Sequence, residues 1–167
     1  MEKFKKILAP VDLSSLSKTG LSYALEIAKA APGGEVLAYN VIPPGETPYP
    51  QAAHKWFATH GDLPQLKKVI EERKALLAKF IAENFAGLLP HVSVREEVEI
   101  GIPHRKIVEK ALQEKVDMVV ICTHGRTGLR HMLIGSVSEQ IVRRAPCPVL
   151  TVPPPRETRR ERLAKSG

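Results

Sequence analysis

The segment 123–136, THGRTGLRHMLIGS, gathers backbone freedom and positive charge directly after a run of apolar residues. Glycine has no Cβ, so a loop rich in glycine lets the backbone come close to a ligand. The segment contains three glycines and two arginines, namely Gly125, Gly128, Gly135, Arg126 and Arg130. Guanidinium groups and backbone amides are good partners for a phosphate group. These residues could therefore hold the phosphates of a ligand.

The residues after Gly135 predict the start of a helix. The sequence SVSE from Ser136 to Glu139 has the pattern of a capping box, so we expect Ser136 to be the N-cap and Glu139 to reach back to it. The first amide groups of a helix have no partners within the helix, and they carry about half a positive charge. An anion would be stabilised at this position.

The spacing alone leaves two interpretations open, a phosphate site and an ordinary loop. Loop glycines and an N-cap serine are common structural features in any α/β protein. The segment matches neither the P-loop nor the dinucleotide-binding fingerprint. The glycines and arginines thus suggest a phosphate site only in combination with their place in the fold.

Other chemistries fit the sequence less well. His124 and His131 could act as acid or base groups, but no Ser-His-Asp set accompanies them. Asp12 could be the phosphoacceptor of a receiver domain, yet the surrounding VDLSS supplies no further acidic residue to hold Mg²⁺. Cys122 could be a redox nucleophile, but a buried thiol at a strand end is usually inert. None of these is favoured as the centre of a reaction.

Strand-like and helix-like segments alternate along the chain. Apolar runs predict five strands, in residues 7–11, 35–42, 91–101, 116–123 and 148–152. Apolar residues with helical spacing predict four helices, around residues 21–28, 66–81, 102–115 and 136–145. Parallel strands need crossover connections, so this order predicts an α/β protein whose parallel sheet is covered by helices on both faces. Gly33 or Gly34 is expected to supply the left-handed residue after the first helix.

The expected fold places three segments at one edge of the sheet. Ligands of open parallel sheets bind beyond the carboxyl ends of the strands, where the strand order reverses. Residues 10–12, residues 40–42 and the residues from Thr123 onward all follow strand ends. We expect the first and fourth strands to be neighbours, which would bring Asp12 opposite the glycine-rich segment. The irregular, proline-bearing residues 43–62 form a loop long enough to cover such a site.

Composition limits the function classes. The 167 residues carry a net charge of +7, and a basic excess favours anionic partners. We expect one domain over residues 1–153 and a basic tail over residues 154–167, which has no aromatic residue for stacking on nucleic-acid bases. The two cysteines and scattered histidines predict neither a disulfide nor a metal site. Without a membrane-length apolar run or a signal peptide, the chain is expected to be cytoplasmic.

Residues 119–153 read VVICTHGRTGLRHMLIGSVSEQIVRRAPCPVLTVP. This stretch resembles the universal stress protein family, whose nucleotide-binding branch has the pattern G-x2-G-x9-G-[ST] here. Gly125, nine further residues and the pair Gly135 and Ser136 match the pattern, while Cys122 occupies the position of its first glycine. ILAPVDLS, NVIPP and EIGIPHRKIVEKA extend the resemblance over nearly the whole chain.

The resemblance implies a fold and an assembly. The fold would be a three-layer α/β/α sandwich with a five-stranded parallel sheet in the order 3-2-1-4-5, Rossmann-like and of the adenine nucleotide alpha hydrolase-like type. The assembly would be a homodimer in which the last strand, Pro148–Val152, meets its copy at the edge of the sheet. A role in the stress response or in signalling is implied as well.

The resemblance also implies a site for ATP or AMP. Asp12 would lie near the ribose or near a Mg²⁺ ion bound with the phosphates. Val41 would offer backbone hydrogen bonds to the adenine edge. The remaining residues around the adenosine and its sugar would be Pro10, Val11, Ile121 and Cys122.

For the phosphates, the resemblance implies a second group of residues. Gly125 would approach them closely, and Gly135, Ser136 and Val137 would hold them from the start of the fourth helix. Arg126 joins this group because of its charge and position rather than through the resemblance.

The sequence shows no hydrolytic machinery. We therefore expect the protein to bind nucleotide and, at most, to hydrolyse ATP slowly. Two other functions stay open. One is a nucleotide-independent, dimeric interaction module that works through its dimer surface and basic tail. The other is a small hydrolase of phosphate esters, which includes a weak ATP hydrolase.

Overall fold

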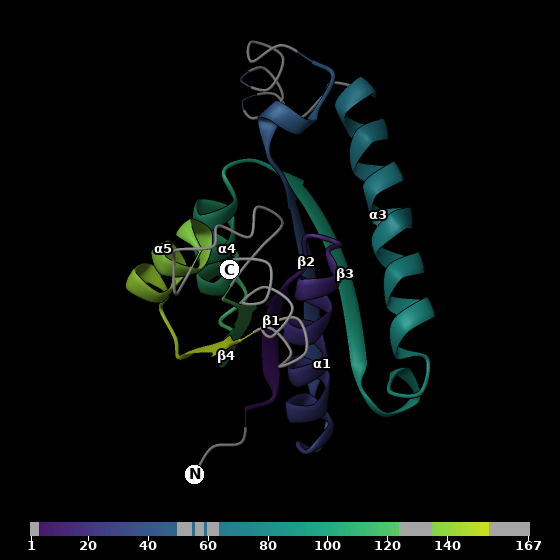
Figure 1. The fold of residues 1–167 in the computed structure, drawn as a ribbon, viewed down its shortest axis with the longest axis vertical. Coiled ribbons are helices and arrows are strands. Elements are labelled where there is room, and N and C mark those ends of the chain that lie inside the picture. The colour runs from purple at the N-terminus through teal and green to yellow at the C-terminus, as the bar shows by residue number, and fades with distance from the viewer. Residues whose placement is uncertain (1–3, 50–54, 56–58, 60–63, 124–134, 154–167) are drawn as a thin grey trace, which may run out of the picture.

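The centre of the molecule is a sheet of five parallel strands (Figure 1). The computed structural model describes residues 4–49, 55, 59, 64–123 and 135–153, so the expected basic tail lies outside it. The strands are β1 (Lys6–Pro10), β2 (Glu35–Ile42), β3 (Ser93–Ile100), β4 (Met118–Cys122) and β5 (Val149–Val152). Their order is β3-β2-β1-β4-β5, which confirms the expected sheet and makes the first and fourth strands neighbours.

Helices cover both faces of the sheet. In the described part of the chain they are α1 (Ser15–Lys29), α3 (Pro64–Phe85), α4 (Pro103–Gln113) and α5 (Ser136–Arg144), with short 3₁₀ turns η1 (Pro44–Glu46) and η2 (Leu89–His91). α1 and α3 pack on one face, and α4 and α5 pack on the other, which confirms the three-layer α/β/α architecture (Figure 1). None of these helices combines the length and the apolarity needed to cross a bilayer.

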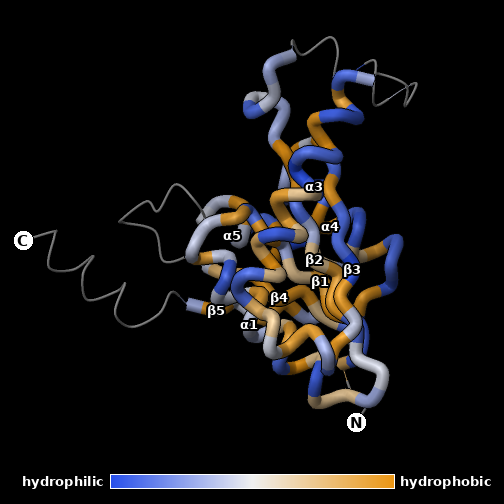
Figure 2. The backbone as a smooth tube through the Cα atoms, turned by 90° about the vertical axis from the view of Figure 1, so that its right-hand side faces the viewer, coloured by the Kyte–Doolittle hydropathy of each residue, from blue (hydrophilic) through white to orange (hydrophobic). Residues whose placement is uncertain are grey.

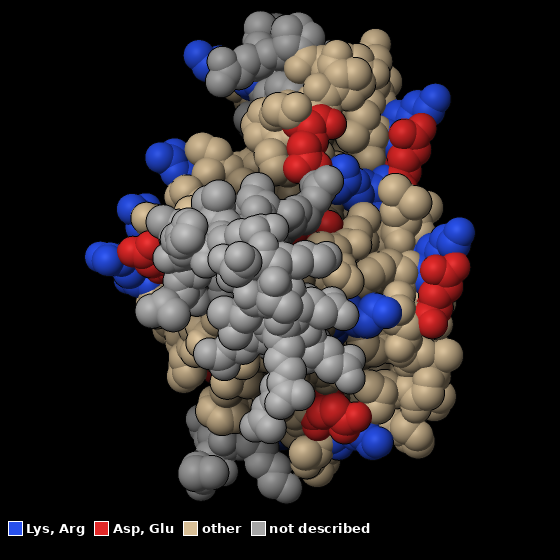
Figure 3. All heavy atoms as spheres, viewed as in Figure 1, with Lys and Arg blue, Asp and Glu red and all other residues tan. Residues whose placement is uncertain are grey.

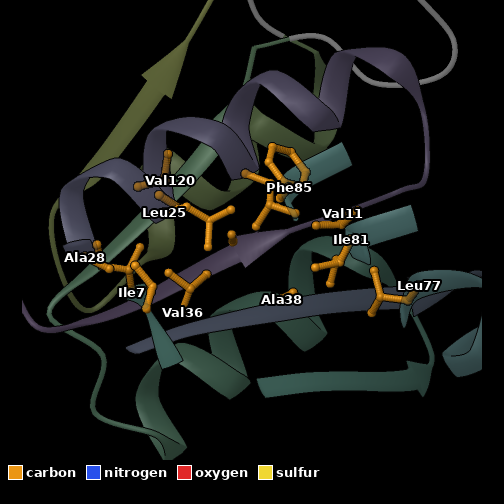
Figure 4. Packing of buried hydrophobic residues seen from close by; sticks show 14 of the residues in the cluster. Ile7, Val11, Leu25, Ala28, Val36, Ala38, Leu77, Ile81, Phe85 and Val120 are labelled. Atoms are coloured by element: carbon orange, nitrogen blue, oxygen red, sulfur yellow. The ribbon is translucent and has the colours of Figure 1, made fainter. Parts of the chain in front are cut away.

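The face under α1 and α3 is a continuous apolar core. Alternate residues of the central strands point to this face and meet the inner sides of both helices (Figure 4). Apolar residues are concentrated along the central strands (Figure 2). Burying one aliphatic side chain completely stabilises the folded state by about 1.5–3 kcal/mol. The core includes Ile7, Ala9, Leu25, Val36, Leu77, Ile81 and Phe85.

The opposite face has a smaller apolar core. Its apolar cluster lies between α4, α5 and the central strands, and includes Leu8, Leu37, Ile107, Val119, Ile121 and Ile141. β3 is an edge strand, as its alternating sequence predicts.

Ion pairs line the outer side of α3 (Figure 3). The partners in Lys68–Glu72 and in Lys79–Glu83 are four residues apart in the helix.

Two glycines determine how α1 is placed. Gly33 has a φ of +72°, so it supplies the left-handed residue expected after the helix. Gly20 faces the end of β4, where an added Cβ would lie 3.2 Å from the backbone nitrogen of Cys122. The absence of a side chain lets the first half of α1 pack directly against the carboxyl end of β4. This brings the start of α1 close to the edge of the sheet where ligands are expected.

Candidate functional site

A cavity of about 240 Å³ lies at the carboxyl ends of β1, β2 and β4. Its wall combines strand ends with residues from the starts of α1, α4 and α5 and from α3. The expected site residues that line it are Pro10, Val11, Asp12, Val41, Ile121, Cys122, Gly135, Ser136 and Val137. Gly125 and Arg126 lie outside the described residues. The structure therefore brings every described residue of the predicted site to one cavity.

The end of β2 presents backbone groups to this cavity. β1 pairs with β2 only as far as Pro10, and the amide of Val11 then donates to the carbonyl of Tyr39 at 2.9 Å. β2 continues to Ile42, whose carbonyl accepts from Gly101 on the opposite side. Because peptide groups alternate in direction along a strand, those of Val41 point to the side where β1 has ended. Val41 thus offers a donor and an acceptor next to each other.

Asn40 fastens the ends of the first two strands together. It is 1% exposed, and its Nδ2 donates to the carbonyl of Val11 at 2.6 Å. A buried hydrogen bond between two strand ends fixes the position of the Val11 peptide. Asn40 was not among the predicted site residues, although a polar residue within the apolar run of β2 is a signal that could have found it.

The start of α1 is closed by its own side chains. Ser14 is the N-cap, and its Oγ accepts from the amide of Ser17 at 3.2 Å. Asp12 in turn accepts from the amide and the hydroxyl of Ser14, at 3.0 and 2.5 Å. Leu13 between them has a φ of +64°, a conformation that costs energy in a residue other than glycine. This tight turn directs Asp12 to the cavity and satisfies the first turn of the helix.

The start of α5 differs from the prediction, and the expected capping box is wrong. The N-cap is Gly135, in extended conformation, and Ser136 is the first residue of the helix. The reason is that the Gly135 amide donates to the Thr123 carbonyl at 2.6 Å and the Gly135 carbonyl accepts from the amide of Glu139, which places the N-cap one residue earlier than expected. Glu139 pairs with Arg143, at 3.1 Å, instead of reaching back. The N-cap therefore makes no side-chain capping bond among the described residues.

Ser138 anchors the first turn of α5 to the sheet. Its hydroxyl donates to the carbonyl of Cys122 at 2.9 Å, and the residue is 4% exposed. Ser138 was not among the predicted site residues. Its spacing of three from the buried Ile141 places both on one helix face, which is the signal that could have identified it. The bond sets where the amides of Ser136 and Val137 lie relative to the cavity.

An ion pair lies at the rim of the cavity. Arg73 of α3 and Glu46 of η1 both line it, and their Nη2 and Oε2 atoms are 3.5 Å apart. Sequence reasoning did not find this pair, because 27 residues separate the two positions and η1 follows an irregular segment.

A charged cluster adjoins the cavity through Tyr39. Burial, together with the charge of Glu99, raises the pKa of Tyr39 well above its usual range, so the hydroxyl stays protonated. Lys110 lies 5.3 Å from the centre of the ring and pairs with Glu97 and Glu99, each at 2.7 Å. Burial alone would lower the pKa of Lys110, but these two hydrogen bonds raise it. The charges of the cluster satisfy one another and stabilise the edge of the sheet.

Comparison with known proteins identifies the family of this chain. The model of the universal stress protein family matches residues 3–153. The chain belongs to this family. Universal stress protein MJ0531 of Methanocaldococcus jannaschii is 32% identical over 154 residues, which cover 92% of this chain and 85% of that protein. The resemblance predicted from the sequence is confirmed.

Solved universal stress proteins share the fold. MJ0577 of the same organism is 31% identical over 158 residues, covering 89% of this chain and 94% of that protein. Its structure superposes with a TM-score of 0.72 and 27% identity, over 92% of this chain and 99% of that chain. A family protein of Arabidopsis thaliana with AMP bound has a TM-score of 0.61 and 17% identity, over 92% and 94% of the two chains. The last likeness shows the fold alone.

Cys122 occupies the position at which the pattern of the nucleotide-binding branch has its first glycine. In the described part of the chain, Leu13 and Lys115 are the non-glycine residues with positive φ. Cys122 therefore has an ordinary strand backbone, and the conformation does not demand glycine. Its side chain is buried at the end of β4 and lines the cavity.

Proposed function

We propose that this universal stress protein binds an adenine nucleotide, ATP or AMP, in the cavity at the ends of β1, β2 and β4. The observation that carries the proposal is that two different kinds of recognition group line one cavity. Val41 contributes a peptide donor and acceptor, and the first turn of α5 contributes amide donors. A ligand that has a heterocyclic base at one end and phosphate at the other would use both.

At one end, the backbone of Val41 complements the edge of adenine. Adenine has an amino donor next to a ring-nitrogen acceptor, and one peptide strand edge can pair with both. The apolar side chains of Ile107 and Ile121 line the same cavity and suit the faces of a base. Pro10 and Val11 lie on the β1 side of the adenosine in this arrangement.

At the other end, α5 suits the phosphates. The amides of Ser136 and Val137 have no partner within the helix, and the helix dipole favours an anion there. Gly135 places no side chain between these amides and the cavity. The proposal extends this group to Gly125 and Arg126, as the family pattern and the charge of Arg126 suggest.

Mg²⁺ belongs to the proposal as an ion bound with the phosphates of ATP. Asp12 and Glu46 are the carboxylates among the described lining residues, and Asp12 is the one next to the strand end of β1. Mg²⁺ prefers oxygen ligands and keeps several waters, so one carboxylate with phosphate oxygens is a suitable set. When bound, the ion would neutralise phosphate charge.

The AMP bound to the Arabidopsis relative is in keeping with the proposed adenine-nucleotide site.

Isothermal titration calorimetry of the full chain with ATP, AMP and GTP tests the proposal. We expect a Kd below about 1 mM for ATP and AMP and weaker binding of GTP, whose edge has a different order of donors and acceptors. If none of the three nucleotides gave a measurable heat of binding, the proposal would be overturned in favour of the nucleotide-independent interaction module. Phosphate release in the same samples, compared with a sample without protein, separates binding from weak ATP hydrolysis.

We further propose a homodimer that forms through β5, the outer strand beside β4. The carbonyls of Pro148 and Val152 accept from the amides of Val119 and Thr123, so the peptide groups of Val149 and Thr151 point to the outer edge. Thr151→Pro would remove a donor from that edge while leaving the bonds to β4 intact. Light scattering should give a dimer for the wild type and for Thr151→Val, and a monomer for Thr151→Pro. A monomeric wild type would refute the homodimer.

The cytoplasmic location and the stress-response role remain predictions.

A further inference from the structure

Arg73 breaks the pattern of its own helix. The inner side of α3 follows residues three or four apart, among them Leu66, Ile70, Leu77 and Ile81, which are buried or half-buried. Arg73 stands in this inward-facing row, and its side chain is 20% exposed, whereas its neighbours Glu72 and Lys74 are exposed. A charged residue at a position where the helix pattern calls for an apolar one is expected at a functional site.

The partner of Arg73 lies on a different element of the cavity wall. Glu46 belongs to η1, which follows β2, and both side chains line the cavity. The start of α3 and the segment after β2 lie side by side at one end of the molecule (Figure 1). The contact joins one guanidinium nitrogen to one carboxylate oxygen at 3.5 Å. A guanidinium has five N–H donors, so this contact leaves it chemically able to bind a ligand as well.

The sheet order places this pair and α5 at opposite ends of the cavity. Glu46 follows β2, and α3 packs on β3, whereas α5 follows β4 and packs on β5. β1 lies between β2 and β4. A nucleotide whose phosphates lie at α5 would therefore extend its base across β1 towards Arg73.

The charge balance at the rim favours the same orientation. An isolated arginine would attract phosphates and compete with α5 for them. Glu46 neutralises Arg73, so the pair presents a donor without a net positive charge. A neutral pair suits a neutral base, and the helix start suits the anionic end.

We propose that Arg73 is a specificity-determining residue that donates a hydrogen bond from its guanidinium to an acceptor atom of the base, with Glu46 holding it in place. This inference rests on the proposed function. It assigns to α3 and η1 a direct part in ligand recognition.

The test measures Kd for adenosine, AMP and ATP with the wild type and with Arg73→Met. Methionine keeps an unbranched apolar stem and suits the inward-facing row of α3, so the variant is expected to fold, which thermal unfolding checks. We expect binding of all three ligands to weaken by the same factor, about tenfold. Lys74→Met, which removes an exposed charge from the next position, should change Kd less than twofold, as expected for a surface residue.

The outcomes separate the alternatives. A loss that grows from adenosine to ATP would mean that Arg73 binds phosphate, and it would overturn the inference. Unchanged affinities would mean that the ion pair only braces the rim, which overturns it as well. Failure of the wild type to bind any of the three ligands would instead refute the proposed function together with this inference.

Discussion

Two helices begin beside the same cavity, and their first turns differ. In α1, Ser14 caps the helix and accepts from the amide of Ser17, while Asp12 accepts from Ser14. In α5, the N-cap is Gly135, which has no side chain to accept from the amides that follow. Both helix starts carry the positive end of a dipole, but α1 already has a local acceptor for it. The difference indicates which helix start is available to an anionic ligand.

The position of each helix reinforces this contrast. Ser138 fixes the first turn of α5 to β4 from beneath, through the Cys122 carbonyl, and leaves the cavity side to the backbone. In α1, Ser17 lines the cavity, but its hydroxyl donates back to the carbonyl of Ser14 at 2.9 Å. Polar groups at the start of α1 therefore satisfy each other, whereas the start of α5 is where we propose that the phosphates bind.

The largest effect is expected when α5 receives an anionic cap of its own. Gly135→Asp would place a carboxylate where the phosphates are proposed to bind, and aspartate is a good N-cap in the extended conformation of this residue. Calorimetry should show a loss of ATP affinity of about 100-fold, because the carboxylate repels phosphate and takes its donors. Thermal stability should stay equal or rise.

Gly87→Asp is the matched control for that change. It adds the same side chain after α3, where a Cβ would have no atom within 4 Å. ATP affinity should stay within a factor of about two of the wild type, since a distant surface charge is screened by salt. Equal losses in both variants would show that net charge, and not the start of α5, governs binding.

The next effect concerns the bond that places α5. Ser138→Ala removes the hydrogen bond to the Cys122 carbonyl, so the free energy of unfolding should fall by about 1–2 kcal/mol in urea titrations. ATP affinity should fall about threefold to tenfold, because the first turn is less firmly placed. An unchanged affinity would show that Ser138 serves stability only.

The corresponding change in α1 should affect stability but not binding. Ser14→Ala removes the cap, so unfolding should become easier by about 1 kcal/mol. The amide of Ser14 still donates to Asp12 in this variant, so ATP affinity should change less than about twofold, a difference that calorimetry resolves. A loss of affinity as large as that of Gly135→Asp would refute the contrast between the two helix starts.

The smallest effect is expected far from both helix starts. Hydrogen bonds from Lys6 and Arg95 lower the pKa of Glu114 to about 2. A carboxylate with a lowered pKa stabilises the fold above its unfolded pKa of about 4.3, and this stabilisation is lost as the pH falls towards 2. Glu114→Gln should reduce the dependence of stability on pH between about 5 and 2. Exposed Glu109→Gln is the control, and a larger change in the control would contradict this assignment.

The contrast also shows what sequence could and could not predict. Strand order and the segments that meet at the cavity follow from the alternation of apolar runs and from the family resemblance, because crossover connections leave few topologies. The start of α5 could not be predicted from SVSE, since the bond from Gly135 to Thr123 depends on where β4 ends. Arg73 was missed for a similar reason, because its partner Glu46 is distant in the chain.

The most direct test follows individual backbone amides during titration with ATP. In ¹H–¹⁵N spectra of the labelled full chain, we expect the amides of Ser136 and Val137 to shift most among the helix-start amides, with a Kd equal to that from calorimetry. Those of Leu16 and Ser17 should shift less. Titration with AMP should give smaller shifts at Ser136 and Val137, because fewer phosphates are present. Larger shifts at the start of α1, or no shifts at α5 despite binding, would contradict the account.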